Sequence, residues 1–271
     1  MKKPRISVIL TAYNRHDLTT VHVRECMNST LIPDEIIVIN DHGTPDLKDM
    51  LKKLDIKTKL IYAYINEDIP WNYTGARNLA ACLSTGDFLI SEDNDNIPAN
   101  HLYALMLKHL QEHPDIDLVL GWGRPVILVE DMIKYPIEEW ESHAKRKAPP
   151  HNDSFMIRRE VFWKMKGYDE KFAGAYAWVC TDWNRRLVRG GFNVHRVKAQ
   201  YFTAVGDGTN VCMCGKSKEE RTKSVVCPDC NLAYKRMSFK NYGLSRGKTH
   251  VQPSGGILNF TYEYEILGNK E

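Results

Sequence analysis

The chain has 271 residues, of which 43% are hydrophobic and 26% are charged, and its formal net charge is +3. No apolar run reaches the roughly 18 to 20 residues that a membrane-spanning helix needs, so membrane insertion is not expected. The composition predicts a soluble globular protein with one main core, because α/β chains of this length often fold into one body with an appendage.

The chain starts with a basic head, as a signal peptide does, but the apolar stretch that follows runs only from Ile6 to Leu10. This stretch is too short for an export signal and predicts a buried first strand. Together with the clustering of four of the seven cysteines, it leads us to expect a reducing, cytoplasmic location.

The first ninety residues alternate short β-branched apolar runs with helical patterns. The apolar runs are ISVIL, EIIVI, KLIYAYI and DFLIS. Such alternation predicts an α/β fold, a mixed and mostly parallel sheet flanked by helices. Because ligands of such sheets bind beyond the carboxyl ends of the strands, the polar segments that follow the runs are the first candidates for a site. These segments are TAYNR, NDHGTPD and EDNDN.

The middle of the chain continues with a helical pattern after Pro98 and a strand-like DLVLGWG. Residues 126–150 are less regular, and we expect a mobile loop over the site there. A helix over TDWNRRLVRGG and a short strand at FNVHRV follow. We expect a main domain over residues 1–205, a small module over 206–250 and a C-terminal segment, 251–271, that packs on the body.

Two acids, Asp93 and Asp95, lie directly after an apolar strand and before a predicted helix. Carboxylates this close can share one hard divalent cation, Mg²⁺ or Mn²⁺, which prefers oxygen ligands and often keeps a phosphate as another. The alternative is that both acids cap the helix. Arg77, in the preceding GARN segment, either supplies a cation for a diphosphate or is a surface charge.

These segments together resemble the ordered landmarks of family 2 glycosyltransferases with the GT-A fold, over about residues 6–187. The landmarks are ISVILTAYNR, EIIVINDHGTPD, GARNLA, GDFLISEDNDNIP and GYDEKFAGAYAWVCTDWNRRL. The resemblance implies single displacement with inversion, from a nucleotide-sugar donor held with the metal. It also implies roles for individual residues: Thr11, Tyr13 and Asp41 at the nucleoside, Arg77 at the nucleotide, Asn94 at the donor sugar, and Asp93 and Asp95 at the metal and diphosphate.

The last landmark is similar to a family motif with a Glu-Asp pair before a helix, whose Asp is the general base. Here Thr181 replaces the Glu and leaves Asp182 as the implied base. The alternatives are that Asp182 is only a first-turn acid of the helix, or that Asp169 or Glu170 is a rival carboxylate.

Some site positions stay open from the sequence. By position, a further metal ligand is His195 or Asp207. The acceptor side of the cleft is predicted from three residues, His151, Asn152 and Trp178. His151 and Asn152 alternatively form a polar turn. An indole near a strand end can stack on a sugar or a base, or pack in the core. This choice applies to Trp122, Trp178 and Trp183.

Four cysteines, Cys212, Cys214, Cys227 and Cys230, form two close pairs separated by a loop. Two thiolate pairs at this spacing suit tetrahedral Zn²⁺, so we predict a structural zinc site in the module. Two disulfides or free thiols are the alternatives; the lack of an export signal disfavours the first and the paired spacing disfavours the second.

The segment from Val211 to His250 contains nine Lys or Arg against three acids, a charge of +6. Aromatic residues among these cations are typical of a surface that tracks phosphates and stacks on bases. We therefore expect a metal-dependent inverting glycosyltransferase that uses a UDP-sugar and modifies, as one acceptor, a hydroxymethylated base in DNA. The alternatives are a glycan, protein or small-molecule acceptor, a nucleotidyltransferase, and a non-catalytic zinc-ribbon binder of nucleic acid.

Overall fold

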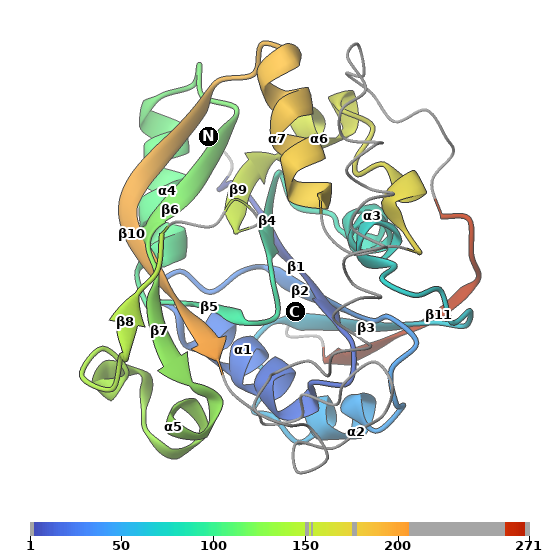
Figure 1. Cartoon of the computed structure of the whole chain (residues 1–271), viewed down its shortest axis with the longest axis vertical. Coiled ribbons are helices and arrows are strands. Elements are labelled where there is room, and N and C mark those ends of the chain that lie inside the picture. The colour runs from blue at the N-terminus through green and yellow to red at the C-terminus, as the bar shows by residue number, and fades with distance from the viewer. Residues whose placement is uncertain (1–2, 150–151, 153, 175–177, 206–257, 269–271) are drawn as a thin grey trace, which may run out of the picture.

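The computed structural model describes residues 3–149, 152, 154–174, 178–205 and 258–268. Within these residues the strands form one mixed, mostly parallel sheet with helices on both faces (Figure 1). The strand order is β11-β3-β2-β1-β4-β9-β6-β10-β7-β8, and β5 pairs with β10 beside this path. The predicted α/β architecture is confirmed.

Four parallel strands make the first half of the sheet, and they coincide with the apolar runs of the sequence. They are β1 (Ile6–Ala12), β2 (Glu35–Asn40), β3 (Lys59–Ile65) and β4 (Phe88–Glu92). Every residue of β2 and β4 is buried. Continuous Val and Ile runs suit these positions because helices cover both faces of the sheet.

The second half of the sheet mixes directions around one long strand, β10 (Val194–Val205). This strand pairs in parallel with β6 in its first half and with β7 in its second half, where it also pairs antiparallel with β5. Its neighbours and the strands beyond them are β5 (Asn96–Pro98), β6 (Leu118–Gly123), β7 (Pro125–Leu128), β8 (Arg146–Lys147) and β9 (Phe155–Arg158).

Three helices pack on each main face of the sheet through separate apolar clusters. One face carries α1 (His16–Asn28), α2 (Leu47–Lys52) and α4 (Leu102–Glu112). The other face carries α3 (Tyr73–Leu83), α6 (Arg159–Lys164) and α7 (Val179–Arg189), together with the short 3-10 turn η2 (Glu170–Phe172). None of the helices in the described part of the chain has the length and apolar character to cross a membrane.

The prediction of a mobile loop over residues 126–150 is wrong for the described residues of that stretch. They form β7, α5 (Val129–Lys134), the 3-10 turn η1 (Ile137–Glu139) and β8. The side chains of Met132 and Trp140 are fully buried there, and the Trp140 ring meets the Phe202 ring edge-on. The irregular pattern therefore reflects short elements around one tryptophan, which burial stabilises.

The last described residues complete the sheet. Strand β11 (Tyr262–Gly268) pairs antiparallel with β3 and covers its edge. The Glu265 carboxylate on β11 contacts Lys48 and Lys52 of α2, at 3.2 and 3.0 Å. The predicted module over 206–250, with its four cysteines, lies outside the described residues. Its zinc site stays a prediction.

Candidate active site

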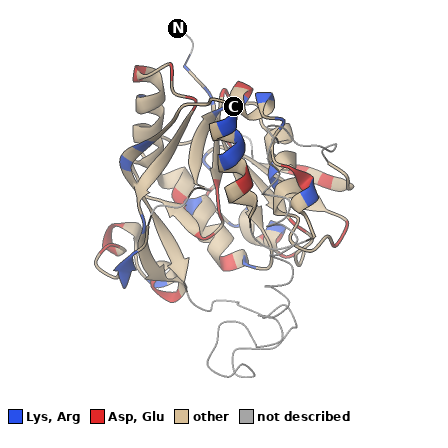
Figure 2. Cartoon of the chain, turned by 45° about the horizontal axis from the view of Figure 1, so that its top comes forward, with Lys and Arg blue, Asp and Glu red and all other residues tan. Residues whose placement is uncertain are grey.

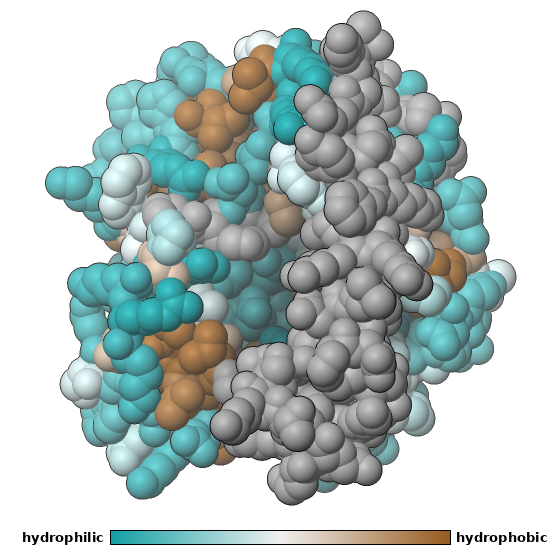
Figure 3. Space-filling view, viewed as in Figure 1, coloured by the Kyte–Doolittle hydropathy of each residue, from teal (hydrophilic) through white to brown (hydrophobic). Residues whose placement is uncertain are grey.

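The predicted donor residues lie at or directly after the carboxyl ends of strands that end side by side in the sheet. In the register of the parallel strands, Leu10 pairs with Glu92 and Ala12 pairs with Asn40, so β1, β2 and β4 end side by side. The backbone N–H of Asp41 donates to the carbonyl oxygen of Ala12 at 2.9 Å. The space-filling view shows a hydrophilic recess in the middle of this face, over β1, β4 and β5 (Figure 3). The fold thus brings the polar segments after these strands together.

Thr11, Tyr13 and Asp41 form the predicted nucleoside side. Thr11 belongs to β1, and the Tyr13 side chain directly after the strand is 57% exposed. Burial raises the pKa of Asp41 to about 7, although the amide of Asn72 lowers it. Burial also raises the pKa of Tyr13, and the nearby charges of Asp68 and Asp41 add to that rise. A carboxyl group that titrates near neutral pH can accept or donate a hydrogen bond.

Asp93, the first acid of the predicted metal pair, is held by groups from α3. Its Oδ1 accepts hydrogen bonds from Arg77 Nη2 at 2.6 Å and from the Tyr73 hydroxyl at 3.1 Å. Arg77 Nη1 also donates to Ser91 Oγ at 2.5 Å and to the Tyr168 hydroxyl at 3.1 Å. The guanidinium is fully buried, so Arg77 is not a surface charge. Its predicted contact with the nucleotide stays a prediction.

Asp95, the second acid, is more open to solvent. Its Oδ2 lies 3.6 Å from Arg15 Nη1, and the Asp95 side chain is 38% exposed against 20% for Asp93. Neither acid caps a helix, because α4 begins at Leu102, beyond β5. The capping alternative is therefore wrong. Two partly exposed carboxylates fit the oxygen ligands that Mg²⁺ or Mn²⁺ requires.

Asn94, between the two acids, turns its side chain toward α1. Its Nδ2 donates to Thr19 Oγ1 at 3.0 Å, and its backbone carbonyl oxygen lies 3.2 Å from His22 Nδ1. The amide side chain is therefore engaged with the protein itself. Its predicted contact with the donor sugar stays a prediction.

Asp182, the predicted general base, lies in the first turn of α7 and is 3% exposed. Its Oδ2 accepts a hydrogen bond from Arg186 Nε at 2.8 Å, one helical turn further on. Arg186 Nη1 in turn donates to the carbonyl oxygens of Met165 and Gly167. The carboxylate is thereby held in a fixed orientation. Trp178 rather than Asp182 takes the N-cap position of the helix.

The donor edge and the base helix are connected through aromatic rings. The Tyr168 hydroxyl accepts from Arg77, which binds Asp93, and the Tyr168 ring stacks on Trp183 with 4.5 Å between centroids. Trp183 follows Asp182 directly in α7. Packed side chains thus form a continuous path between Asp93 and the helix that carries Asp182.

The rival carboxylates, Asp169 and Glu170, serve local structure. The Asp169 side chain accepts from the backbone N–H of Lys171 and caps η2. Glu170 accepts from the Asn78 side chain and from the backbone N–H groups of Leu258 and Asn259. These contacts tie α3 to the last described segment, and the choice of Asp182 over both rivals stays a prediction.

The acceptor-side candidates are only partly described. Asn152 Oδ1 accepts from Arg196 Nη2 at 2.7 Å, whereas His151 lies outside the described residues. Trp178 has a positive φ of 69° and is partly buried against the apolar cluster below α7. Trp122 is 57% exposed at the end of β6. These positions neither establish nor contradict an acceptor site.

Two open alternatives are decided. Trp183 is fully buried and stacks on Phe155 and Tyr168, so core packing accounts for it. His195 is not a further metal ligand. It pairs with Val119 near the start of β10, eight residues before Thr203, which pairs with Asn96. Three strand spacings of about 4.8 Å separate β10 from β4 in the order β4-β9-β6-β10, so His195 lies at least roughly 14 Å to the side of the strand that leads to the two acids. Asp207 falls outside the described residues.

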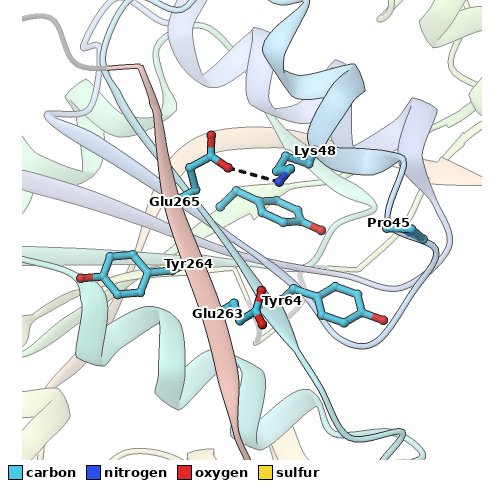
Figure 4. A pocket seen from close by; sticks show the side chains of 7 residues that line it. Pro45, Lys48, Tyr64, Glu263, Tyr264 and Glu265 are labelled. Carbon is cyan, nitrogen blue, oxygen red and sulfur yellow. Dashed lines mark hydrogen bonds and ion pairs between the residues drawn. The ribbon is translucent and has the colours of Figure 1, made fainter.

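A pocket of about 240 Å³ lies elsewhere, where β11 crosses β3 beside α2 (Figure 4). Its lining residues are Pro45, Lys48, Tyr62, Tyr64, Glu263, Tyr264 and Glu265. The ammonium of Lys48 already contacts Glu265 at 3.2 Å. None of the predicted donor or base residues lines this pocket, so it is separate from the candidate site.

Several partners at the site were not predicted from the sequence, namely Tyr73, Ser91, Tyr168, Arg186 and His22. Two of them carry a local signal. Tyr73 precedes Arg77 by four residues and Arg186 follows Asp182 by four, a spacing that places each pair on one helix face. The others come from distant segments, so spacing alone does not reveal them.

The fold and the site define an α/β protein with paired acids at the carboxyl edge of its sheet. The chain belongs to glycosyl transferase family 2, whose family model matches residues 7–166, more than half of the chain. This supports the family that the sequence landmarks resemble.

Individual proteins resemble the chain at low sequence identity. An uncharacterized glycosyltransferase of Rickettsia bellii is 28% identical over 113 residues, which are 42% of this chain and 16% of that protein. A mannosyltransferase of Pyrobaculum calidifontis, solved with GDP-Man and Mn²⁺, matches with a TM-score of 0.58 at 17% identity. The match covers 77% of this chain and 59% of that one.

A second solved structure, TarS of S. aureus in complex with UDP-GlcNAc, has a TM-score of 0.58 at 13% identity. The match covers 75% of this chain and 59% of that one. At these identities the structures show a shared fold, which supports the expected GT-A architecture. This chain thus spans about three fifths of each of the two solved chains and a smaller part of the Rickettsia protein.

Proposed function

We propose that this chain transfers a sugar from a nucleotide-sugar donor to an acceptor hydroxyl in a metal-dependent, inverting reaction. One observation carries the proposal: Asp93 is fixed by Arg77 and Tyr73 at the edge of the sheet where Tyr13 and Asp41 also emerge. Family membership and the solved relatives with bound nucleotide sugars support it.

In this proposal the donor side binds and orients the leaving group. Thr11, Tyr13 and Asp41 contact the nucleoside. Asp93 and Asp95 hold Mn²⁺ or Mg²⁺, which, when bound, stabilises the negative charge that grows on the departing diphosphate. Arg77 fixes Asp93 and adds positive charge near the same edge. The mannosyltransferase solved with Mn²⁺ supports a divalent cation as the cofactor.

On the acceptor side, Asp182 takes the proton from the attacking hydroxyl. The hydroxyl oxygen forms a bond to the anomeric carbon while the bond from that carbon to the diphosphate oxygen breaks. One displacement inverts the configuration at that carbon. Arg186 keeps the carboxylate oriented for this role.

We propose a UDP-sugar as the donor, although the solved relatives carry GDP-Man in one case and UDP-GlcNAc in the other. For the acceptor, the basic segment Val211–His250 supports a hydroxymethylated base in DNA, with zinc on its four cysteines. On the described body, Lys and Arg are interspersed with Asp and Glu (Figure 2). The DNA proposal therefore rests on the segment, and glycans, proteins and small molecules are the competing acceptors.

The experiment is nucleotide release from a panel of UDP- and GDP-sugars with Mn²⁺, with EDTA as the metal control. Each donor is incubated alone, with unmodified DNA and with hydroxymethylated DNA. Release of nucleoside diphosphate stimulated only by hydroxymethylated DNA supports the whole proposal. Diphosphate release without such stimulation retains the transferase and rejects this acceptor. Release of pyrophosphate instead identifies a nucleotidyltransferase, and DNA binding without donor turnover identifies a binding protein.

A further inference from the structure

A fully buried polar cluster lies directly behind the two candidate metal ligands. It consists of His22 and Cys26 on α1, Glu92 at the end of β4 and Tyr103 on α4, none more than 1% exposed. The ligand atoms of His22, Cys26 and Glu92 lie within 4.8 Å of one another. A polar group that is buried without a hydrogen-bond partner destabilises the folded chain, so the hydrogen bonds of these four side chains must be identified.

The donors and acceptors of the cluster can be assigned from its distances. The Tyr103 hydroxyl donates to Glu92 Oε2 at 2.7 Å. Since its single proton is used there, the Cys26 thiol donates to the Tyr103 oxygen, 3.1 Å away. His22 Nε2 lies 2.9 Å from the same Glu92 oxygen. Glu92 Oε2 is therefore the shared partner of Tyr103 and His22.

The other ring nitrogen of His22 fixes the direction of its second hydrogen bond. Nδ1 lies 3.2 Å from the backbone carbonyl oxygen of Asn94, which can only accept, so Nδ1 carries a proton and donates to it. Nε2 shares a hydrogen bond with Glu92 Oε2, 2.9 Å away. His22 therefore links Glu92 to the Asn94 backbone in either protonation state of the imidazole.

The distances favour hydrogen bonds over a metal ion. Nitrogen and oxygen ligands at about 2.0 to 2.1 Å from a tetrahedral Zn²⁺ would be separated by about 3.3 to 3.4 Å. The 2.9 Å between His22 Nε2 and Glu92 Oε2 instead matches a hydrogen bond. Tyr103 occupies the same Glu92 oxygen. The cluster is therefore a hydrogen-bonded network, in which Glu92 Oε1 is a buried oxygen without a hydrogen-bond partner among the described residues.

We infer that His22 is a positioning residue: its imidazole bridges the Glu92 carboxyl group and the Asn94 carbonyl and thereby fixes the segment that carries Asp93 and Asp95. The Asn94 carbonyl lies between the two acids in the chain, and the Asn94 side chain is bound to Thr19 of the same helix. Helix α1 thus holds this segment from behind by two contacts. The inference rests on the proposed metal-dependent function for its effect on metal binding.

The first test reads the protonation of His22 Nδ1 in the intact chain. Protein labelled with ¹⁵N at histidine is examined by NMR at pH 7.5, and the His22 resonances are assigned by their loss in His22→Gln. A protonated Nδ1 is expected, because the Asn94 carbonyl can only accept. A deprotonated Nδ1 would overturn the bridge. Because this measurement uses the wild-type chain and no substrate, it judges the bridge independently of the proposed transfer activity.

The second test reads the position of the acids through Mn²⁺ binding in the presence of UDP. In His22→Gln one side-chain amide cannot reach both partners of the imidazole, so we expect the Kd for Mn²⁺ to rise at least about tenfold, as for other residues that orient metal ligands. At saturating Mn²⁺ the kcat should change less than the Kd. His109→Gln, which replaces a partly exposed histidine on α4, is the matched control and should bind Mn²⁺ as the wild type does.

The outcomes separate the two proposals. A folded His22→Gln variant, judged by circular dichroism and Tm, with an unchanged Kd for Mn²⁺ overturns the positioning role. Stoichiometric metal in the purified chain that is lost in both His22→Gln and Cys26→Ser overturns the hydrogen-bonded network in favour of a metal site. A wild-type chain that binds neither Mn²⁺ nor nucleotide sinks the proposed function and with it the positioning role, while the NMR result still decides the protonation of His22 Nδ1.

Discussion

The donor edge and the base helix hold their acids in different ways. At the end of β4 and directly after it, three acids each contact a basic side chain from another segment: Glu92 with His22, Asp93 with Arg77 and Asp95 with Arg15. On α7, Asp182 contacts Arg186 of the same helix, four residues further on. The donor acids therefore depend on how α1, α3 and β4 pack together, whereas the orientation of Asp182 is largely a local property of one helix.

The Arg77–Asp93 and Arg186–Asp182 pairs both contain a fully buried guanidinium, so the loss of either acid leaves an uncompensated charge. At the donor edge that charge lies between elements, whereas on α7 Arg186 keeps the carbonyl oxygens of Met165 and Gly167 as partners. Stability is therefore measured beside activity in both regions. Four substitutions test this contrast.

The largest effect is expected for Asp182→Asn. The amide keeps the shape of the side chain but cannot take a proton, so kcat for transfer should fall by about 10³-fold, within the range of general-base catalysis. Donor binding should stay within a fewfold of wild type, measured by titration with nucleotide sugar. Asp115→Asn, at an exposed position, is the control. Full transfer activity in Asp182→Asn would remove the assignment of the base.

The next effect is expected for Arg77→Met. It removes the buried partner of Asp93 and the hydrogen bonds to Ser91 and Tyr168, so the free energy of unfolding should fall by about 3 kcal/mol. Urea denaturation measures this change. Lys108→Met, at a side chain that is 69% exposed, should change stability little. A loss no greater than that of the control would contradict the dependence of the donor edge on packing between elements.

A smaller effect is expected for Asp95→Ala. Its contact with Arg15 is 3.6 Å long and more than one third exposed, so it adds little stability. The loss of one metal ligand should raise the Kd for Mn²⁺ at least as much as the loss of an outer-shell partner does, by about 10- to 100-fold or more, while Tm changes little. Asp49→Ala, at an exposed acid of α2, should leave both quantities unchanged. Equal Mn²⁺ binding by Asp95→Ala and wild type would exclude Asp95 as a ligand.

The last effect concerns pH. The pKa of Asp41 is raised from 3.8 to about 7 by burial, so between these values the folded chain holds a proton that the unfolded chain has released. The contribution of Asp41 to stability is therefore present below pH 4 and is lost as pH rises through 7. Asp41→Asn should remove this dependence and stabilise the chain at pH 8 relative to pH 4, by at most about 4 kcal/mol for a shift of about three pKa units. Denaturation curves at both pH values show whether the wild-type slope depends on Asp41.

Much of the donor edge was predictable because it is local in sequence. The Val- and Ile-rich runs became β1 to β4, and the polar segments behind them meet at one edge because parallel strands end together. The helix after Pro98 and the strand at residues 118–123 also formed as predicted. In these regions, periodicity and strand direction together determine where side chains emerge.

The rest depended on contacts between distant segments. Tyr168 reaches Arg77 across 91 positions of the chain, and His22 reaches Glu92 across 70. No pattern in a short window encodes such pairs. The prediction for residues 126–149 failed because this stretch of mixed hydropathy folds around a buried ring, Trp140. Composition does not distinguish this case from an irregular loop.

Strand β11 also has a consequence for the order of folding during synthesis. Its partner β3 leaves the ribosome about two hundred residues earlier, and the two strands pair from Tyr262 with Ile65 to Gly268 with Leu60. At 5 to 20 residues per second, roughly 10 to 40 seconds pass before the partner exists. Throughout that interval β3 is an open edge that can pair with other nascent chains. Yield of native protein should therefore depend on chaperone supply more than the stability of the finished fold suggests.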